Sequence, residues 1–377
     1  MARRKRYDTK QPGTQKLVDE IVHGTFMTEG TMVAFPLCFP AVSMPIPADE
    51  SRITAMDVSA SGMVYAGTSG RAAHLLVGMF HGVTGMVLDL GRAEGATESV
   101  AFCCGQHKFV AAVNGPRGGQ LIARRLQSLP FDLIQEWHIG RMPFEKVQGL
   151  PKGERLVHAV TDAKRERAIG VTEKRLFTVE IESSRLALGP ELPGRGRLAR
   201  GEKGGIFGPD DDGTLWRYDA ARRALKRHAV RLPRGEWGHA LRWARDPASG
   251  TLYTADAAGR LFGFSEKGGF TPCLGRAPVT PVGPMAVTGD GRLFGACGEG
   301  IGKLFCYNPT TRSVTRLGVA VSVFERRRYG YAFGDAVTGR DGEIVFGEDD
   351  DLGHLWLYFP RIQPAAARKT ARRTRGK

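Results

Sequence analysis

The sequence predicts an all-β fold, a single seven-bladed β-propeller whose ring is closed by an N-terminal strand. Three observations support this expectation. A short unit built around a leucine recurs seven times along the chain, and large apolar residues alternate with other residues after several of these leucines. The 377 residues also include 50 glycines, about twice the usual share, which is typical of many short strands joined by turns.

The repeated unit starts with a glycine near the end of an apolar run. A polar turn follows, and after it come a leucine and a large apolar residue. Successive leucines are 46, 55, 39, 46, 43 and 51 positions apart, close to the ~40–50 residues of one four-stranded blade. The second and fifth copies have Asn114 and Thr254 in place of the glycine. The seven units are Gly67…Leu75-Leu76, Asn114…Leu121-Ile122, Gly170…Leu176-Phe177, Gly208…Leu215-Trp216, Thr254…Leu261-Phe262, Gly295…Leu304-Phe305 and Gly347…Leu355-Trp356.

Within a copy, period-two alternation and turn pairs indicate strands joined by hairpins. A strand with one buried face alternates in this way because successive side chains point to opposite faces. We therefore expect Leu304 and Leu355 to be buried. The alternating segments are Trp216-Arg-Tyr218, Phe262-Gly-Phe264, Phe305-Cys-Tyr307 and Trp356-Leu-Tyr358, and the turn pairs are Ser61-Gly62, Ser249-Gly250, Asp290-Gly291 and Asp341-Gly342.

The seventh copy ends near Ile362 with only three strands. A segment before the first copy, Thr31 to Phe35, has the composition of a strand and is expected to complete the seventh blade. Such a closure removes the open edges of the ring. The expected organisation is a propeller at 25–362, a basic N-terminal tail at 1–24 with a short helical segment, and a basic disordered C-terminal tail at 363–377.

Most of the net charge of +15 lies in the two tails: residues 1–16 carry +5, and residues 361–377 carry +7. The propeller itself is close to neutral. We therefore expect any affinity for polyanions to be weak, independent of sequence, dependent on salt and confined to the tails. The alternative is that the tails have no dedicated partner.

Six cysteines are spread along the chain without Cys-x-x-Cys spacing, which favours reduced thiols and a cytoplasmic protein. No apolar stretch follows the N-terminal basic residues, so no secretory signal is expected. The segment from Thr31 to Ala48 is almost free of ionisable groups, but its four prolines exclude a spanning helix. We expect a monomer that does not associate with membranes.

The glycine-turn-leucine-aromatic unit resembles that of streptogramin-lyase-like and gluconolactonase-like propellers, over roughly residues 25–362. The unit lacks the Trp-Asp dipeptide of WD repeats, and paired glycines do not recur in every copy as they do in kelch repeats. The resemblance concerns the composition of the blades, so it implies a fold rather than an activity. Streptogramin-lyase-like propellers are metal-assisted lyases with histidines at the channel mouth, but the sequence contains no complete His/acid motif of theirs.

Candidate site residues lie in the loops that join blades and in those that join the second and third strands of a blade. Both sets are expected on one face, at the mouth of the central channel. Ligand contacts are expected from Arg71, His74, Glu236, Trp237, Arg326 and Arg328. Catalytic groups, if present, are expected from His239, His354 and Tyr329.

Two acidic loops suggest a divalent cation, Ca²⁺, Mg²⁺ or Mn²⁺, because carboxylate oxygens are the ligands that hard cations prefer. The better candidate provides Glu348, Asp349 and Asp351 as metal ligands, beside His354. The other is Asp210–Asp212. The alternative for both loops is a solvated turn, in which Asp stabilises the turn itself. His81, His107, His138 and His158 fall on expected strands or bends, where a structural hydrogen bond is the simpler expectation.

Two functions remain open from the sequence. In the first, the loop face binds a small carboxylated or carbohydrate ligand, or a protein. In the second, the protein is a metal-assisted lyase or lactonase acting on a sugar acid, with the blade-seven loop and Arg326–Arg328 contacting metal and substrate. We favour binding, because no complete catalytic set is visible. Gly194 to Ala199 has dinucleotide-binding spacing but lacks the βαβ context that this function requires.

Overall fold

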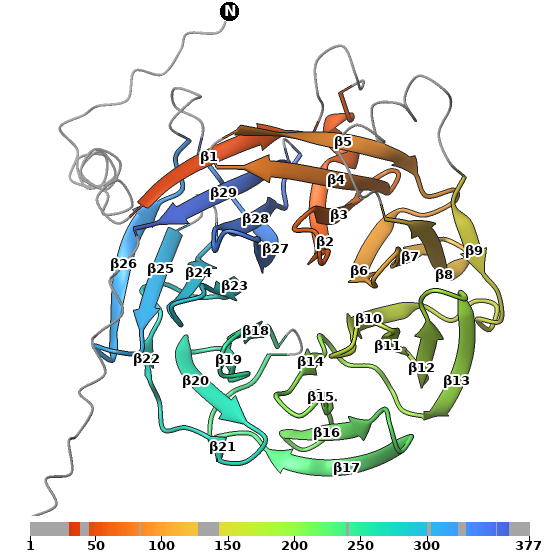
Figure 1. The fold of residues 1–377 in the computed structure, drawn as a ribbon. Coiled ribbons are helices and arrows are strands. Elements are labelled where there is room, and N and C mark those ends of the chain that lie inside the picture. The colour runs from red at the N-terminus through yellow and green to blue at the C-terminus, as the bar shows by residue number, and fades with distance from the viewer. Residues whose placement is uncertain are drawn as a thin grey trace, which may run out of the picture.

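The computed structural model describes residues 30–37, 45–82, 84–126, 143–238, 241–299, 303–322, 329–351 and 353–361. These residues form seven antiparallel sheets, which surround a common centre (Figure 1). The expectation of an all-β, seven-bladed propeller is confirmed. The predicted basic tails lie outside the described residues. Among the residues described, no helix has the length and apolar character needed to cross a membrane.

A short 3₁₀ helix, η1 (Ala48–Glu50), precedes blade one. Blade one contains β2 (Arg52–Val58), β3 (Val64–Ser69), β4 (His74–His81) and β5 (Thr84–Arg92). Blade two contains β6 (Glu98–Cys104), β7 (Lys108–Gly115), β8 (Gly118–Arg125) and β9 (Glu145–Val147). Blade three contains β10 (Leu156–Thr161), β11 (Arg167–Thr172), β12 (Arg175–Glu180) and β13 (Arg185–Glu191).

Blade four contains β14 (Ala199–Arg200), β15 (Ile206–Pro209), β16 (Thr214–Asp219) and β17 (Ala224–Arg231). Blade five contains β18 (Ala244–Arg245), β19 (Leu252–Ala255), β20 (Arg260–Ser265), β21 (Gly269–Phe270) and β22 (Gly275–Arg276). Blade six contains β23 (Val282–Val287), β24 (Leu293–Cys297), β25 (Lys303–Asn308) and β26 (Ser313–Val319). Blade seven contains β27 (Phe333–Thr338), β28 (Ile344–Glu348) and β29 (His354–Pro360).

The fourth strand of blade seven is β1 (Gly30–Pro36), which pairs antiparallel with β29 from Gly30↔Pro360 to Pro36↔His354. Figure 1 shows β1, in red, along the outer side of β29, in blue. The side chains of β1 alternate between the two neighbouring blades. Met32 packs in the cluster shared with blade six, and Phe35 lies 5.1 Å from Phe80 of blade one, measured between ring centroids. The predicted ring closure is confirmed.

The recurrent glycine has a steric cause. In blade four, Gly208 lies opposite Trp216, and a Cβ on Gly208 would lie 2.3 Å from the indole ring. In blade three, a Cβ on Gly170 would lie 2.2 Å from the ring of Phe177, the residue opposite it. The aromatic side chain of the third strand therefore crosses the second strand at a position where only glycine leaves room.

The leucine of each repeat is the common element of the core. Both Leu304 and Leu355, which were expected to be buried, are at most 1% exposed. Side chains of neighbouring blades interdigitate at each interface of the ring, and Leu304 packs between blades six and seven with Phe294 and Trp356. The seven leucines are Leu75, Leu121, Leu176, Leu215, Leu261, Leu304 and Leu355, all of them buried.

Replacing Leu304 with alanine is expected to lower the free energy of unfolding by about 3 kcal/mol, through lost burial and the cavity left behind. Equilibrium unfolding in urea measures this loss. Leu188→Ala is the control, because Leu188 is 44% exposed on β13 and should change stability by less than ~0.5 kcal/mol. Equal losses for the two variants would contradict the packing described here.

The first strand of each blade lines the centre of the ring (Figure 1). We call the face that bears the connections between blades and the loops between second and third strands the loop face. We call the opposite face, with the hairpins between first and second strands, the hairpin face. Each first strand runs from the loop face to the hairpin face, so its later residues lie deeper in the channel.

Candidate functional site: an arginine-lined central cavity

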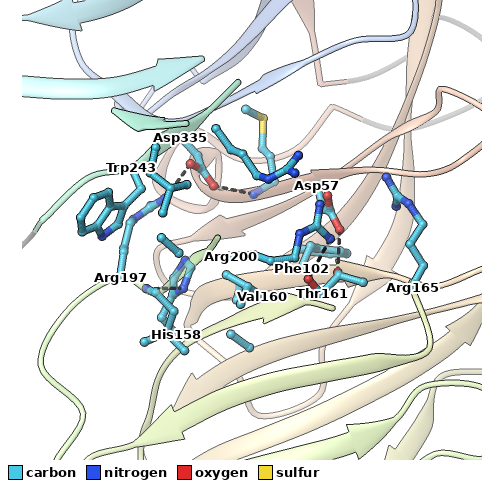
Figure 2. Close-up of a pocket in the computed structure, with 17 residues that line it drawn as sticks. Asp57, Phe102, His158, Val160, Thr161, Arg165, Arg197, Arg200, Trp243 and Asp335 are labelled. Atoms are coloured by element: carbon cyan, nitrogen blue, oxygen red, sulfur yellow. Dashed lines mark hydrogen bonds and ion pairs between the residues drawn. The ribbon is translucent and has the colours of Figure 1, made fainter. Parts of the chain in front are cut away.

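The centre of the ring contains a cavity of about 220 Å³, which we call the channel cavity. First strands or the residues beside them supply its lining in six blades. Figure 2 shows Arg197, Trp243 and Asp335 on one side and Asp57, Thr161 and Arg165 on the other. The charged and histidine side chains of the lining are Asp57, His158, Arg165, Arg197, Arg200, Arg245 and Asp335.

Four of the arginines at the centre come from a sequence repeated in two neighbouring blades. Arg197-Leu-Ala-Arg200 leads into β14, and Arg242-Trp-Ala-Arg245 leads into β18. Arg197 and Arg242 are nearer the loop face, and Arg200 and Arg245 lie three residues further along each strand. The two blades therefore present paired guanidinium groups at two levels of the channel.

The pair nearer the loop face, Arg197 and Arg242, which we call the upper pair, is anchored to β27. Arg197 Nη1 lies 2.6 Å from Asp335 Oδ1 and its Nη2 donates to the carbonyl oxygen of Gly334 at 3.1 Å. Arg242 Nη1 donates to the same carbonyl oxygen. Arg197 is thus neutralised by Asp335, whereas Arg242 forms no ion pair with any described residue.

The lower pair, Arg200 and Arg245, has no carboxylate partner in the described part of the chain. Arg200 Nη1 donates to the carbonyl oxygens of Thr161, at 3.1 Å, and Asp162, at 2.6 Å. Arg245 Nε is buried and donates to none of the described residues. Both arginines line the channel cavity, and burial together with the nearby charge of Arg245 lowers the pKa of Arg200.

Asp57 lies in the wall of the cavity, where burial raises the pKa of its carboxyl group despite hydrogen bonds from the backbone N–H of Cys104 and Val58. Together with Asp335 it faces four lining arginines, Arg165, Arg197, Arg200 and Arg245. Arg165 reaches the same end of the channel from the β10–β11 hairpin and donates to the carbonyl oxygens of Val58 and Cys104. The site therefore has an excess of positive charge.

His158 has the structural hydrogen bond expected from the sequence, since its Nδ1 accepts from the backbone N–H of Leu198 at 3.2 Å. It also lines the channel cavity. Burial, with the charges of Arg197 and Arg242, lowers the pKa of His158 well below its usual value, so the ring is neutral near pH 7. Because Nδ1 is an acceptor, the proton is on Nε2, and His158 is a hydrogen-bond donor there rather than a base.

The sequence-predicted ligand residues of blade one, the exposed Arg71 and the buried His74, both contact the buried Glu50. His74 Nδ1 lies 3.0 Å from Asp89 Oδ2, and its Nε2 lies 2.9 Å from Glu50 Oε2. Arg71 and Arg92 also form ion pairs with Glu50, at 2.7 and 2.8 Å. His74 lies at the start of β4, the third strand of the blade, and its two ring nitrogens are already occupied by side chains of the protein itself.

The predicted metal ligands of blade seven, Glu348, Asp349 and Asp351, do not converge on one point. Glu348 is fully buried and its Oε2 accepts from Trp356 Nε1 at 3.0 Å, while His354 Nδ1 lies 3.4 Å from the same oxygen. Asp349 pairs with Arg52 at 2.9 Å, and Asp351 is exposed. Within the ranges described, no three His, Cys, Asp or Glu side chains are grouped as metal ligands.

The other predicted site residues are also separate from the channel cavity. Trp237 Nε1 donates to the carbonyl oxygen of Pro233, and its ring lies 5.5 Å from that of Phe262. The backbone carbonyl of Glu236 accepts from Ala257, and Tyr329 forms a β-bridge with Val321. His239, Arg326 and Arg328 lie outside the described residues. None of the predicted residues that are described lines the channel cavity.

Sequence reasoning overlooked the channel arginines, although a signal for them was present. The spacing Arg-x-Ala-Arg occurs at 197–200 and again at 242–245, each shortly before the second strand of a repeat. A residue can be assigned to the channel only when it is known that its strand is the innermost strand of its sheet. The repeated pair could therefore have been found by aligning the blades, but its function could not.

The ring and its cavity define the chain as a seven-bladed β-propeller with a basic central cavity. Among solved structures, it is similar to virginiamycin B lyase from Staphylococcus aureus, with a TM-score of 0.61, 9% identity and coverage of 88% of this chain and 99% of that one. A catalytically inactive variant of that lyase with quinupristin gives a TM-score of 0.59 at 10% identity, with the same coverage of both chains.

The extracellular domain of the putative one-component system BT4673 from B. thetaiotaomicron is also similar, with a TM-score of 0.53 and 11% identity over 87% of this chain and 39% of that one. No protein-family model and no curated protein matches the sequence. At these identities, the likeness shows the fold alone. The streptogramin-lyase-like resemblance is confirmed in this sense, while the lyase or lactonase activity and the divalent cation stay predictions.

Proposed function

We propose that this propeller binds a small organic anion with at least two carboxylate groups in the channel cavity. The single observation that carries the proposal is the lower arginine pair, since Arg200 and Arg245 line the same cavity and neither forms an ion pair with a carboxylate among the described residues. Burying such charges is costly unless an opposite charge compensates them. A bound dianion would supply that charge.

The chemistry of the lining favours a carboxylate ligand. Guanidinium groups are planar forks that match the two oxygens of a carboxylate. The neutral His158 adds an N–H donor, and the described residues that line the cavity include no lysine. The volume of about 220 Å³ is below the ~300–1,000 Å³ of drug-sized sites, which favours a compact molecule such as a four-carbon dicarboxylate or citrate.

Titration calorimetry of the full chain with succinate, citrate and inorganic phosphate tests the proposal. We expect a dicarboxylate or citrate to bind, and Arg245→Gln to weaken binding at least ~10-fold, or ~1.4 kcal/mol. Arg245 is the residue of choice because Arg200 also holds backbone carbonyls of blade three. Binding should weaken as salt is added, because the attraction is electrostatic.

Arg222→Gln is the matched control, because Arg222 is exposed on the outer side of blade four and should leave binding unchanged. Succinamide, which has the same length without charge, should not bind. The proposal is wrong if none of the three anions binds, or if binding is equal in the Arg245→Gln and Arg222→Gln proteins. Binding of phosphate without binding of succinate or citrate would show that the cavity prefers phosphate, and it would contradict the proposed carboxylate ligand.

A further inference from the structure

A second cavity, of about 530 Å³, opens on the loop face over blades five, six and seven. We call it the loop-face pocket. Its walls come from the connection before β18, the loops β19–β20 and β24–β25, and the residues at the start of β23 and β27. Most of its lining is apolar, and the larger apolar side chains are Leu241, Pro281, Val282, Pro284, Met285 and Phe333.

One cation lies in the wall of this apolar pocket. Arg242 lines the pocket, and the carbonyl oxygen of Gly334 is its hydrogen-bond acceptor among the described residues. Burial and the neighbouring charge of Arg197 lower the pKa of Arg242 to about 10, so the guanidinium stays charged near pH 7. A buried charge in apolar surroundings is stable only with a compensating partner.

The carboxylate that also lines the pocket does not supply this partner. Asp256 is fully buried and its Oδ2 lies 2.6 Å from Arg260 Nε, while its Oδ1 accepts from the Arg260 backbone N–H at 2.8 Å. Asp335 is paired with Arg197 on the channel side. Within the described chain, the excess charge of the loop-face pocket therefore comes from Arg242.

The rim of the pocket has an unusual exposed side chain. Tyr331 is 47% exposed, and it is one of only two large hydrophobic residues in the described ranges to be so exposed. Aromatic side chains at the edge of a cavity contribute contact area at low entropic cost. Tyr331 is therefore placed to cover an apolar group that enters the pocket.

We propose that the loop-face pocket is a second binding site, for an apolar monocarboxylic acid. The carboxylate binds to the free nitrogen atoms of Arg242, and the hydrocarbon part lies between Val282, Met285 and Phe333, with Tyr331 over it. This site differs in ligand class from the channel cavity, where the paired arginines favour a compact dianion. It does not depend on the channel cavity being occupied.

Calorimetric titration of the full chain with 4-phenylbutyrate, and with 4-phenylbutan-1-ol as its uncharged analogue, tests this proposal. We expect the acid to bind at least tenfold more tightly than the alcohol. Arg242→Gln should weaken binding of the acid at least tenfold, and Tyr331→Ala should weaken it about three- to fivefold. Arg242→Lys keeps the charge and should retain part of the affinity.

The channel variant Arg245→Gln is the matched control, because it removes the arginine three residues further along the same blade, which lines the channel cavity instead of the loop-face pocket. It should leave binding of 4-phenylbutyrate unchanged. Loss of binding in Arg245→Gln would place the acid in the channel cavity and overturn the proposal, as would equal affinities for acid and alcohol. Failure of 4-phenylbutyrate to bind up to its solubility limit would also overturn it.

If Arg242→Gln does not fold, Arg242→Lys and Tyr331→Ala still decide the question. Tyr331 is exposed, so its truncation should not disturb the core. Unchanged affinity in both of these variants would overturn the proposal. Because succinate and citrate probe the channel cavity separately, failure of this site and failure of the proposed function give different results.

Discussion

Replacing Met32 with aspartate is expected to lower the free energy of unfolding by about 5 kcal/mol or more. Met32 is fully buried on β1, opposite Tyr358, in the cluster between blades six and seven. Removing a buried methionine side chain costs ~2–5 kcal/mol, and burying a carboxylate without a partner adds to that cost. The substitution should therefore open the ring at its closure. Equilibrium unfolding in urea, followed by tryptophan fluorescence, measures the effect.

Thr31→Asp provides the matched control, since Thr31 is the neighbouring residue of β1 and its side chain is exposed. It should change the free energy of unfolding by less than ~0.5 kcal/mol. If Met32→Asp were as stable as Thr31→Asp, β1 would not close the ring in solution. The pair of variants thus separates ring closure from a general effect of added charge on this strand.

Replacing His74 with alanine is expected to cost about 3 kcal/mol near pH 6. The imidazole bridges Asp89 and Glu50, and all three side chains are at most 10% exposed. Breaking such a buried pair leaves uncompensated charge, which typically costs ~3–5 kcal/mol. Arg71 and Arg92 remain beside Glu50 and reduce the loss. His81→Ala, at the exposed end of the same strand, should cost less than ~0.5 kcal/mol.

The stabilisation by His74 should depend on pH in a defined direction. Burial by itself would lower the pKa of His74, but its hydrogen bonds to Asp89 and Glu50 raise it. Its contribution is therefore complete below the usual histidine pKa of about 6.5 and is lost as the pH rises through the raised value. Burial would raise the pKa of Glu50, but His74, Arg71 and Arg92 lower it, so its contribution is lost as the pH falls through that lowered value.

The difference in unfolding free energy between the original protein and His74→Ala should therefore be largest at about pH 5–6. It should become smaller at high pH, once His74 loses its proton in the folded state. Urea unfolding at pH 5.5, 7 and 9 measures this trend. A difference that grows as the pH rises would contradict the charged network described for blade one.

The number of blades and their closure followed from the sequence because both depend on local patterns. Leu304 and Leu355 are buried where their repeats predicted, and the turn glycines Gly250 and Gly342 have positive φ angles of 72° and 86°. The closing strand was recognisable because Thr31 to Phe35 matched the one strand missing from the seventh repeat. Alternation and turn conformation are properties of a few neighbouring residues.

The sites depended on relations that no local pattern contains. His74 was correctly placed on the loop side of its blade, but its partners Glu50 and Asp89 lie 24 and 15 residues away, so its burial in a charged network was not visible. The acidic run at 348–351 similarly divides between a buried residue, an ion pair with Arg52 and an exposed aspartate.

The sequence by itself therefore determined the fold class, the seven repeats, the buried leucines and the strand that closes the ring. Only the tertiary structure decided which charges meet at the centre. Arg197 and Asp335 are 138 residues apart and form an ion pair, whereas Arg200 and Arg245 line the same cavity without an ion pair to a carboxylate of the described residues. The reason is that the lining of the channel comes from the first strands of separate blades, and only closure of the ring brings these strands around one axis.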